Sequence, residues 1–194
     1  MCLVFFDFDR TLTARDTIFP LGLRLARMGP ENGRKTARLA WALFLLKSRI
    51  LSNHQFKERF CRVLLKGHLE QDVRALSRSF ADDHVAPQLN RKMVETLFEH
   101  RGRGDEVYIV SSNFRFLLEA MSGHLDINGV IATEAETANG RFTGRLAGFA
   151  CSGPEKLSRV LARFDTERVK NAVAYGDSAD DGSLLQFVKT AVWV

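Results

Sequence analysis

The 194-residue chain has few cysteines, few prolines and no apolar run as long as a membrane span. The three cysteines, at positions 2, 61 and 151, form no CxxC pair, which argues against a disulfide scaffold or zinc site and favours a reducing compartment. The longest uninterrupted apolar run, residues 39–46, is less than half of the roughly 20 residues needed to span a bilayer. The apolar N-terminus is too short for a secretory leader. We therefore expect a cytoplasmic protein that does not cross a membrane.

Only four prolines occur, whereas 45% of the residues are hydrophobic and 26% are charged, values typical of a globular protein. This composition excludes a disordered or collagen-like chain. The length suits one domain, or one core domain that carries a small insert.

Charge is distributed unevenly along the chain. The net charge of +5 results from 28 basic and 23 acidic residues. Between residues 20 and 70 there are 11 basic and three acidic residues, a local charge of +8, and the rest of the chain has 17 basic and 20 acidic residues. This asymmetry suggests an anionic partner: a nucleic acid, a membrane surface or a phosphorylated substrate.

Four short apolar runs, at residues 3–6, 107–110, 130–133 and 172–175, end abruptly in polar residues. Each is hydrophobic almost throughout and rich in β-branched or aromatic residues, as are strands buried on both faces of a parallel sheet. A fifth candidate strand lies at 191–194. Helical patterns between the later runs predict crossover connections, so the expected fold class is α/β with a doubly wound, Rossmann-like sheet. We expect the strand order 5-4-1-2-3, with the first strand central.

The stretch between the first two strands, residues 16–100, shows helical periodicity without a convincing strand. We interpret it as an all-helical cap inserted into an α/β core of residues 1–15 and 101–194. Its last helix, near residues 86–100, is expected to return to the sheet.

Three breaks in the pattern are expected outside the strands. The helical periodicity is interrupted at residues 28–33 and 66–69. After the third strand, Asn139-Gly140 separates two segments of mixed polarity, which predicts a β-hairpin turn.

Acidic side chains follow two of the predicted strands. Asp7 and Asp9 come after the first strand, and residues two apart in an extended segment point to the same side. Asp177, Asp180 and Asp181 follow the fourth strand. Parallel sheets bind ligands at the carboxyl ends of their strands, and carboxylates held close together require a cation. Since oxygen ligands favour Mg²⁺ over zinc, we expect a shared magnesium site, although turn formation or helix capping would explain either cluster alone.

Two further features indicate an anion site. Ser111 follows the second strand in the sequence IVSSN, and Lys156 opens a later helix. Hydroxyl and free N–H groups before a helix bind anions, although N-capping by Ser112 or Asn113 also explains them. A cation at a helix start is unfavourable for the helix dipole, which suggests that Lys156 holds a phosphate, although this feature alone favours a solvated surface lysine.

Together these motifs resemble those of the haloacid dehalogenase superfamily of phosphohydrolases, in the right order along the whole chain. Asp7 and Asp9 match its D-x-D-x-T signature with Thr11 as the threonine, and Asp177 with Asp181 matches its terminal acidic motif. The helical insert and the hairpin resemble the phosphoserine-phosphatase-like branch, subfamily IB. The resemblance implies a Mg²⁺-dependent phosphatase.

The resemblance also implies a role for each site residue. Asp7 attacks phosphorus to form an aspartyl-phosphate, and Asp9 acts as general acid and base. Mg²⁺ is held by Asp7, Asp177 and the backbone carbonyl of Asp9. The other candidate residues are the phosphate-binding Thr11, Ser111, Ser112 and Lys156, the supporting Asp180 and Asp181, and the substrate-binding Arg10, Asp16, Arg59 and Arg62.

The sequence departs from phosphoserine phosphatases at three places. Arg10 stands where a small residue is frequent, and Asp16 lies near the place of a glutamate that contacts the substrate ammonium. Ser112-Asn113 replaces a double glycine. These departures argue against phosphoserine itself as the substrate.

The substrate class depends on the segment TARLAWALFLLKSRIL, whose apolar stripe is bounded by basic residues. If the stripe is the buried face of a cap helix, we expect a small soluble phosphorylated metabolite. If it meets an anionic membrane surface, we expect a peripheral lipid phosphatase resembling the phosphatidylglycerophosphate phosphatases of this branch. A third hypothesis is a non-catalytic anion or nucleic-acid binder. No nucleic-acid partner is expected, because the basic residues are not interleaved with aromatic ones.

Overall fold

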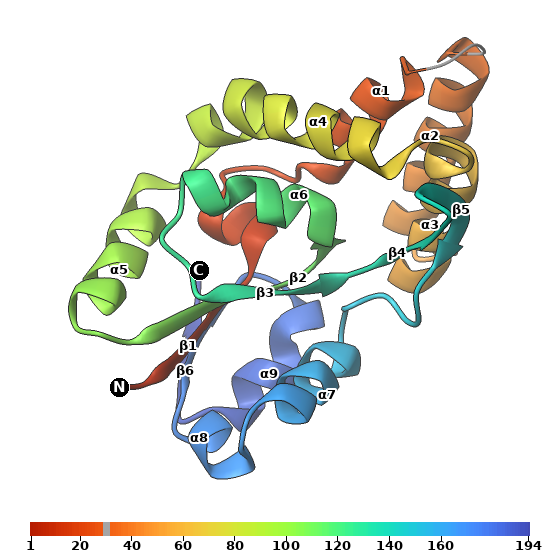
Figure 1. Ribbon diagram of the computed structural model, residues 1–194. Helices are drawn as coiled ribbons and strands as arrows, with labels where there is room; N and C mark the ends of the chain where they lie inside the picture. The colour runs from red at the N-terminus through yellow and green to blue at the C-terminus, as the bar shows by residue number, and fades with distance from the viewer. Residues whose placement is uncertain (29–31) are drawn as a thin grey trace.

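The computed structural model describes residues 1–28 and 32–194, and a five-stranded parallel sheet forms its centre (Figure 1). The strands are β1 (Leu3–Phe6), β2 (Glu106–Phe114), β3 (Gly129–Thr133), β6 (Val173–Gly176) and β7 (Thr190–Trp193). Their order, β3-β2-β1-β6-β7, confirms the predicted arrangement with the first strand in the middle. Because all neighbouring strands are parallel, their carboxyl ends meet at one edge of the sheet.

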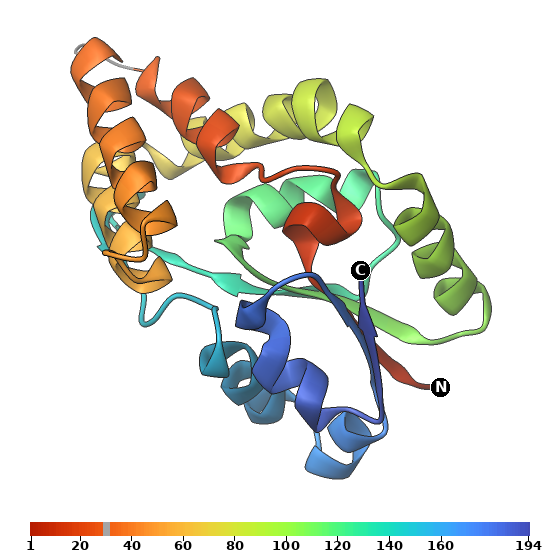
Figure 2. The ribbon, with the colours of Figure 1, turned by 180° about the vertical axis from the view of Figure 1, so that it is seen from behind.

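Helices cover both faces of this sheet. Among the described residues, five α-helices lie between β1 and β2 in the chain: α1 (Ile18–Ala26), α2 (Asn32–Lys47), α3 (Asn53–Phe60), α4 (Glu70–Phe80) and α5 (Arg91–Gly102). Four follow β2: α6 (Arg115–Ala120), α7 (Pro154–Arg163), α8 (Thr166–Lys170) and α9 (Gly182–Phe187). Figures 1 and 2 show α5 and α6 on one side of the sheet and α7, α8 and α9 on the other.

The alternation of side chains along β1 explains this two-sided cover. Val4 and Phe6 belong to an apolar cluster shared with α5 and α6, whereas Leu3 and Phe5 belong to a second cluster shared with α7, α8 and α9. Successive residues of a strand point to opposite faces, so a strand buried on both faces is apolar throughout. The doubly wound sheet predicted from these runs is confirmed.

The chain between β1 and β2 forms no strand among its described residues. Its last helix, α5, packs on β2, as expected for a helix that returns to the sheet. The expected cap boundary at residue 100 lies two residues before the end of α5. We propose that residues 16–100 form the cap, and we refer to α1, α2 and α3 as the cap helices. Within the described ranges, no helix combines the length and the apolar character needed to cross a membrane.

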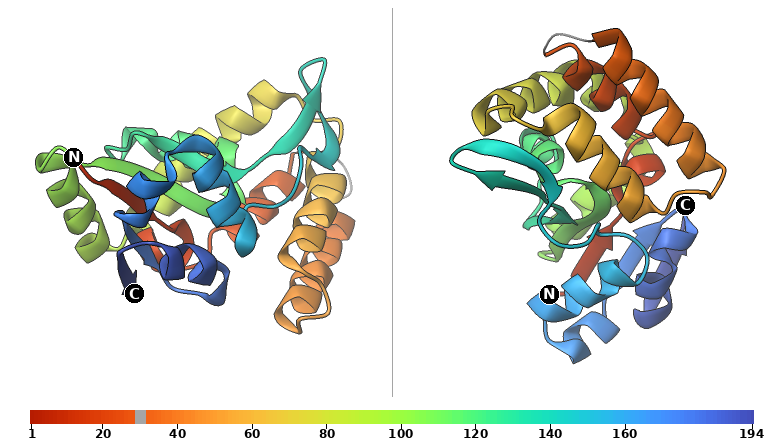
Figure 3. Two further views of the ribbon diagram at one scale, coloured as in Figure 1. Left: turned by 90° about the horizontal axis from the view of Figure 1, so that it is seen from below. Right: turned by 90° about the vertical axis from the view of Figure 1, so that its right-hand side faces the viewer.

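The predicted hairpin is formed by β4 (Ala135–Ala138) and β5 (Arg141–Leu146). Asn139 and Gly140 both have positive φ angles, 50° and 71°, which fit a type I′ turn. The hairpin lies beside the cap, because the amide of Gly67 donates to the carbonyl of Phe142 at 2.8 Å and the amide of Phe142 donates to the carbonyl of His68 at 3.0 Å. Figure 3 shows the hairpin next to α3.

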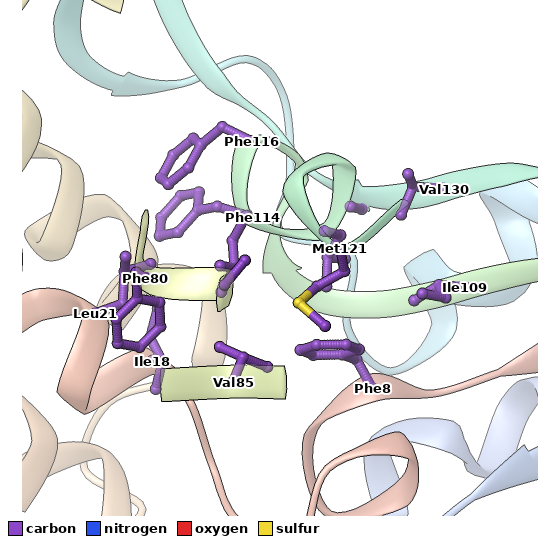
Figure 4. Packing of buried hydrophobic residues seen from close by; sticks show 14 of the residues in the cluster. Phe8, Ile18, Leu21, Phe80, Val85, Ile109, Phe114, Phe116, Met121 and Val130 are labelled. Carbon is purple, nitrogen blue, oxygen red and sulfur yellow. The ribbon is translucent and has the colours of Figure 1, made fainter. Parts of the chain in front are cut away.

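A single apolar cluster joins the cap to the core. Ile18 and Leu21 of α1 belong to the same cluster as Phe114 at the end of β2 and Met121 beyond α6. Figure 4 shows these side chains in one group with Phe8, the residue between the two candidate catalytic acids, which lies next to Met121. The position of the cap over the end of β1 therefore depends on continuous hydrophobic packing.

The structure differs from the expectations at two elements. β2 extends to Phe114 instead of ending at residue 110, with a shift of register between Ser111 and Phe114 where it pairs with β3. α8 was not predicted, because five residues are too few to show helical periodicity. The expected break at 66–69 is confirmed between Leu65 and Glu70, whereas residues 29–31 of the break at 28–33 lie outside the described residues.

The start of α3 is fixed by a capping box. The hydroxyl of Ser52 accepts from the amide of Gln55 at 3.2 Å, and the Gln55 side chain accepts from the amide of Ser52 at 2.9 Å. We expect Ser52→Ala to lower the free energy of unfolding by about 1 kcal/mol, measured by urea denaturation. The control is Ser48→Ala, since Ser48 is exposed and its side chain makes no hydrogen bond to the described residues. Equal losses in the two variants would contradict the role of the cap.

Candidate active site

The end of β1 presents two carboxylates to one side of the chain. Phe8 is fully buried in the core, while Asp7 and Asp9 both line a cavity of about 660 Å³. Arg10 follows with a φ of 62°, an uncommon value for a residue with a side chain, so the backbone turns immediately after the second acid. The spacing of the two aspartates thus places both at the cavity, as expected.

Lys156 of α7 lies buried at the base of this cavity, with 2% of its surface exposed. Its ammonium group donates to Asp7 Oδ1 at 2.7 Å and to Asp181 Oδ1. Burial lowers the pKa of Lys156, but the charges of the two carboxylates and the hydrogen bonds to them raise it overall. Asp181 is itself held by the amide of Ser178 at 3.1 Å and its hydroxyl at 2.9 Å. The lysine therefore stays charged and fixed beside Asp7.

Three carboxylates from two strand ends form a candidate cation site. Oxygen atoms of Asp7, Asp177 and Asp181 all lie within 4.8 Å of one another. Burial raises the pKa of Asp7 and of Asp177, which reflects the cost of placing charge there. Arg10 Nε lies 3.2 Å from Asp177 Oδ2 and 3.5 Å from Asp16 Oδ1.

The donor set of this cluster fits Mg²⁺. Lys156 and Arg10 supply two positive charges to the acids Asp7, Asp177 and Asp181, and a phosphoryl group would add further negative charge. A hard cation with oxygen ligands restores the balance.

The carboxylate of Asp9 stands outside this cluster and has its own hydrogen bonds. Its Oδ1 accepts from the amide of Thr17 at 2.8 Å and from its hydroxyl at 2.7 Å, and its Oδ2 accepts from Asn113 Nδ2 at 3.0 Å. Burial raises the pKa of Asp9 to about 6, against the lowering effect of the Thr17 hydrogen bond. A carboxyl with that pKa can hold a proton near neutral pH and give it up again, as a general acid and base must.

The predicted phosphate-binding residues lie at different depths. Ser111 is buried and Ser112 half-buried, and both line the cavity with Lys156. Thr11 is fully buried, does not line the cavity, and its hydroxyl has no hydrogen-bond partner among the described residues. The structure thus brings both serines to the site, and leaves Thr11 beneath it.

The other candidates divide between two cavities. Arg10, Asp16 and Asp180 line the same cavity as Asp7, and Asp180 accepts from Asn53 of α3 at 3.0 Å. Arg59 and Arg62 line a separate cavity of about 190 Å³ on the cap, so the structure does not bring them to the site. The reason is the direction in which the apolar face of α3 points. Phe56, Lys57 and Phe60 of α3 are buried, which turns Arg59 and Arg62 to the exposed side.

The sequence reasoning missed three residues that the structure brings to the site. Thr17 and Asn113 hold Asp9, and Lys57 lines the cavity with only 3% of its surface exposed. The available signal for Lys57 was its place on the apolar face defined by Phe56 and Phe60, where a charged residue is rarely buried. No comparable signal marked Thr17, because its contact with Asp9 depends on the turn after β1.

The chain is similar to known proteins over most of its length. The haloacid dehalogenase-like hydrolase family matches residues 4–186. The phosphoserine phosphatase SerB1 of Mycobacterium tuberculosis is 28% identical over 193 residues, covering 97% of this chain and 63% of SerB1. The protein CicA of Caulobacter vibrioides is 30% identical over 188 residues, covering 94% of this chain and 81% of CicA. This chain spans 63 to 68% of the first four curated relatives that it matches.

Solved structures share the fold. A Bordetella pertussis protein of unknown function superposes with a TM-score of 0.82 at 25% identity, covering 95% of this chain and 85% of that protein. A substrate-bound phosphoserine phosphatase superposes with a TM-score of 0.69 at 20% identity, covering 96% and 82%. The predicted likeness to the phosphoserine-phosphatase branch and the prediction of an enzyme are confirmed. The family match over nearly the whole chain shows that the chain belongs to the haloacid dehalogenase-like hydrolase family.

Proposed function

We propose that the chain hydrolyses a phosphomonoester of a small metabolite through an aspartyl-phosphate on Asp7, with Mg²⁺ as cofactor. The observation that carries this proposal is the buried contact between Asp7 and Lys156 beside Asp177, at the base of the cavity that also contains Asp9. Such a site presents a nucleophile, a fixed cation and a proton donor to one phosphoryl group.

In the first step, a carboxylate oxygen of Asp7 attacks phosphorus. The bond from phosphorus to the leaving oxygen breaks, and Asp9 gives its proton to that oxygen. Thr17 and Asn113 hold Asp9 in one orientation during the transfer. Lys156 and the Ser111 hydroxyl position the phosphoryl oxygens and offset their charge.

In the second step, water attacks phosphorus, and Asp9 takes up a proton from that water. The bond between phosphorus and the Asp7 oxygen breaks, so phosphate leaves and the carboxylate is restored. Mg²⁺, held by Asp7, Asp177 and the backbone carbonyl of Asp9, would supply positive charge between the nucleophile and the phosphoryl group. Asp181 keeps Lys156 in place through both steps.

Metal dependence is the first test of this proposal. We expect phosphate release from 4-nitrophenyl phosphate to disappear in EDTA and to return when Mg²⁺ is added, because the acidic cluster requires a cation. Nitrophenol release measured by absorbance gives the rate. Full activity in EDTA would contradict a magnesium site.

Substitutions of the two acids after β1 are expected to impair the reaction in different ways. Asp7→Asn removes the nucleophile, so no burst of nitrophenol should precede turnover. Asp9→Asn keeps the nucleophile and should lower the rate with an alkyl phosphate by about 10²–10⁴-fold, the usual contribution of general acid catalysis. The decrease in rate caused by Asp9→Asn should be smaller for 4-nitrophenyl phosphate, since nitrophenolate needs little protonation to leave. A rapid-quench burst in Asp7→Asn would exclude the assignment.

A second candidate, a lipid phosphatase at a membrane surface, rests on the outer face of α2. Leu39 and Ala42 pack inward, whereas Trp41 and Phe44 are 59% and 56% exposed and stack with ring centroids 5.4 Å apart. Ile50, just beyond the helix, is also 66% exposed. Exposed Arg38, Lys47 and Arg49 lie in the same segment. Basic side chains around apolar aromatic ones are typical of helices that lie on anionic membranes.

Co-sedimentation with phosphatidylglycerol liposomes tests this candidate. Binding at low salt should weaken at high salt, since each basic residue near an anionic surface contributes about 1 kcal/mol that salt screens. The double variant with Trp41→Ser and Phe44→Ser should lose binding. The control Phe98→Ser, which changes a 46% exposed aromatic residue on α5, should retain it. Absence of binding at low salt would leave the metabolite as the substrate.

A further inference from the structure

Lys57 has an unusual environment for a charged residue. It lies on α3 with 3% of its surface exposed and lines the same cavity as Asp7, Asp9 and Lys156. Its ammonium group lies 5.0 Å from the centre of the Phe114 ring. Within residues 1–28 and 32–194, no carboxylate lies within ion-pair distance of this ammonium group, and the ammonium group donates no hydrogen bond.

The neighbouring acids are already engaged. Both oxygens of Asp9 accept hydrogen bonds from Thr17 or Asn113, and Asp180 accepts from Asn53. Burying an ammonium group without an anion is costly, and such groups are normally paired. Burial lowers the pKa of Lys57 to about 8, partly opposed by the charge of Asp9. Lys57 therefore presents to the cavity a cation that forms no ion pair with the described residues, and an anionic group of a ligand can fill that place.

The position of Lys57 indicates which part of a ligand it meets. Lys156 is fixed on Asp7, where the phosphoryl group reacts, and Arg10 is paired with Asp177. The ammonium group of Lys57 lies over the ring of Phe114, and the neighbouring Asn113 donates to Asp9, the acid that protonates the leaving oxygen in our mechanism. Lys57 therefore lies on the cap side of the cavity, toward the leaving group.

We propose that Lys57 binds a second anionic group on the leaving alcohol, so that the preferred substrates are phosphate esters of hydroxy acids or of similarly charged alcohols. This inference rests on the proposed function for the position of the phosphoryl group. Among the described cap residues, Lys57 is the buried cation that lines this cavity, and the exposed Arg15 and Lys47 at the same cavity are hydrated and discriminate less. Lys57 is thereby a specificity-determining residue.

Two small substrates isolate the second anion. Phosphoglycolate and ethyl phosphate have the same carbon chain length and leaving oxygen, but only phosphoglycolate carries a carboxylate. We expect Lys57→Met to lower kcat/KM for phosphoglycolate by about 10- to 100-fold, the loss typical of a hydrogen bond to a charged group. The value for ethyl phosphate should change less than about threefold, because the phosphoryl contacts remain.

The matched control is Arg59→Met, which removes an exposed cation two residues along α3 and should leave the ratio of the two substrates unchanged. Lys57→Met is expected to melt no lower than the parent, because it removes an unpaired buried charge. Lys57→Gln provides a second variant, with the same expected loss of preference, if the methionine disturbs the cap.

The outcomes distinguish a failure of this inference from a failure of the proposed phosphatase function. An equal loss for both substrates in Lys57→Met, or a parent enzyme that does not prefer phosphoglycolate, would overturn the assignment to a second anion. If the parent hydrolyses neither substrate nor 4-nitrophenyl phosphate, the proposed function fails. In that case, calorimetry without metal still tests the Lys57 site by comparing the binding of phosphoglycolate with that of ethyl phosphate. We expect the parent to bind phosphoglycolate more tightly, and we expect Lys57→Met to lose this preference.

Discussion

The contact of Lys156 with Asp7 and Asp181 is the interaction on which the site depends. It joins the start of α7 to the end of β1 and to the turn after β6, and all three side chains are buried. Gly176 makes the approach possible, because a Cβ atom there would lie 2.7 Å from the Asp181 side chain. Removing one partner from such a buried network leaves an uncompensated charge, which is strongly destabilising. The sheet order, with β1 central, is what brings these residues together.

The cap and the core contribute different parts of the chemistry. Under the proposed function, the strand ends supply the reacting and phosphate-facing groups, and buried hydrogen bonds hold Asp7 and Asp9 among them. The cap helices supply the apolar side chains Ile18, Leu43 and Phe56 and the cation of Lys57 to the wall of the same cavity. In the proposed mechanism the sheet sets the reaction type, and our further inference assigns the choice of leaving group to the cap. Because a single apolar cluster joins cap and core, the two parts are held in register.

The strands and the acids at their ends could be predicted, because a strand buried on both faces is apolar throughout and ends abruptly in polar residues. The cap could be predicted only as helices. Periodicity shows that α3 has an apolar face, but the direction of that face depends on tertiary packing. Arg59 and Arg62 were therefore placed at the site, although they lie on the exposed side, and Lys57 was missed. For the same reason, the sequence could not predict that Trp41 is exposed while Leu39 is buried.

The central claim is that Asp7 becomes covalently phosphorylated. Borohydride reduces an acyl phosphate and leaves a free carboxylate unchanged. The enzyme should be mixed with substrate and Mg²⁺, quenched in acid during turnover, reduced, digested and analysed by mass spectrometry. The account predicts homoserine at position 7 only when substrate is present, with Asp9 and Asp177 unmodified. Reduction at another aspartate, or none at position 7 under conditions of steady turnover, would contradict it.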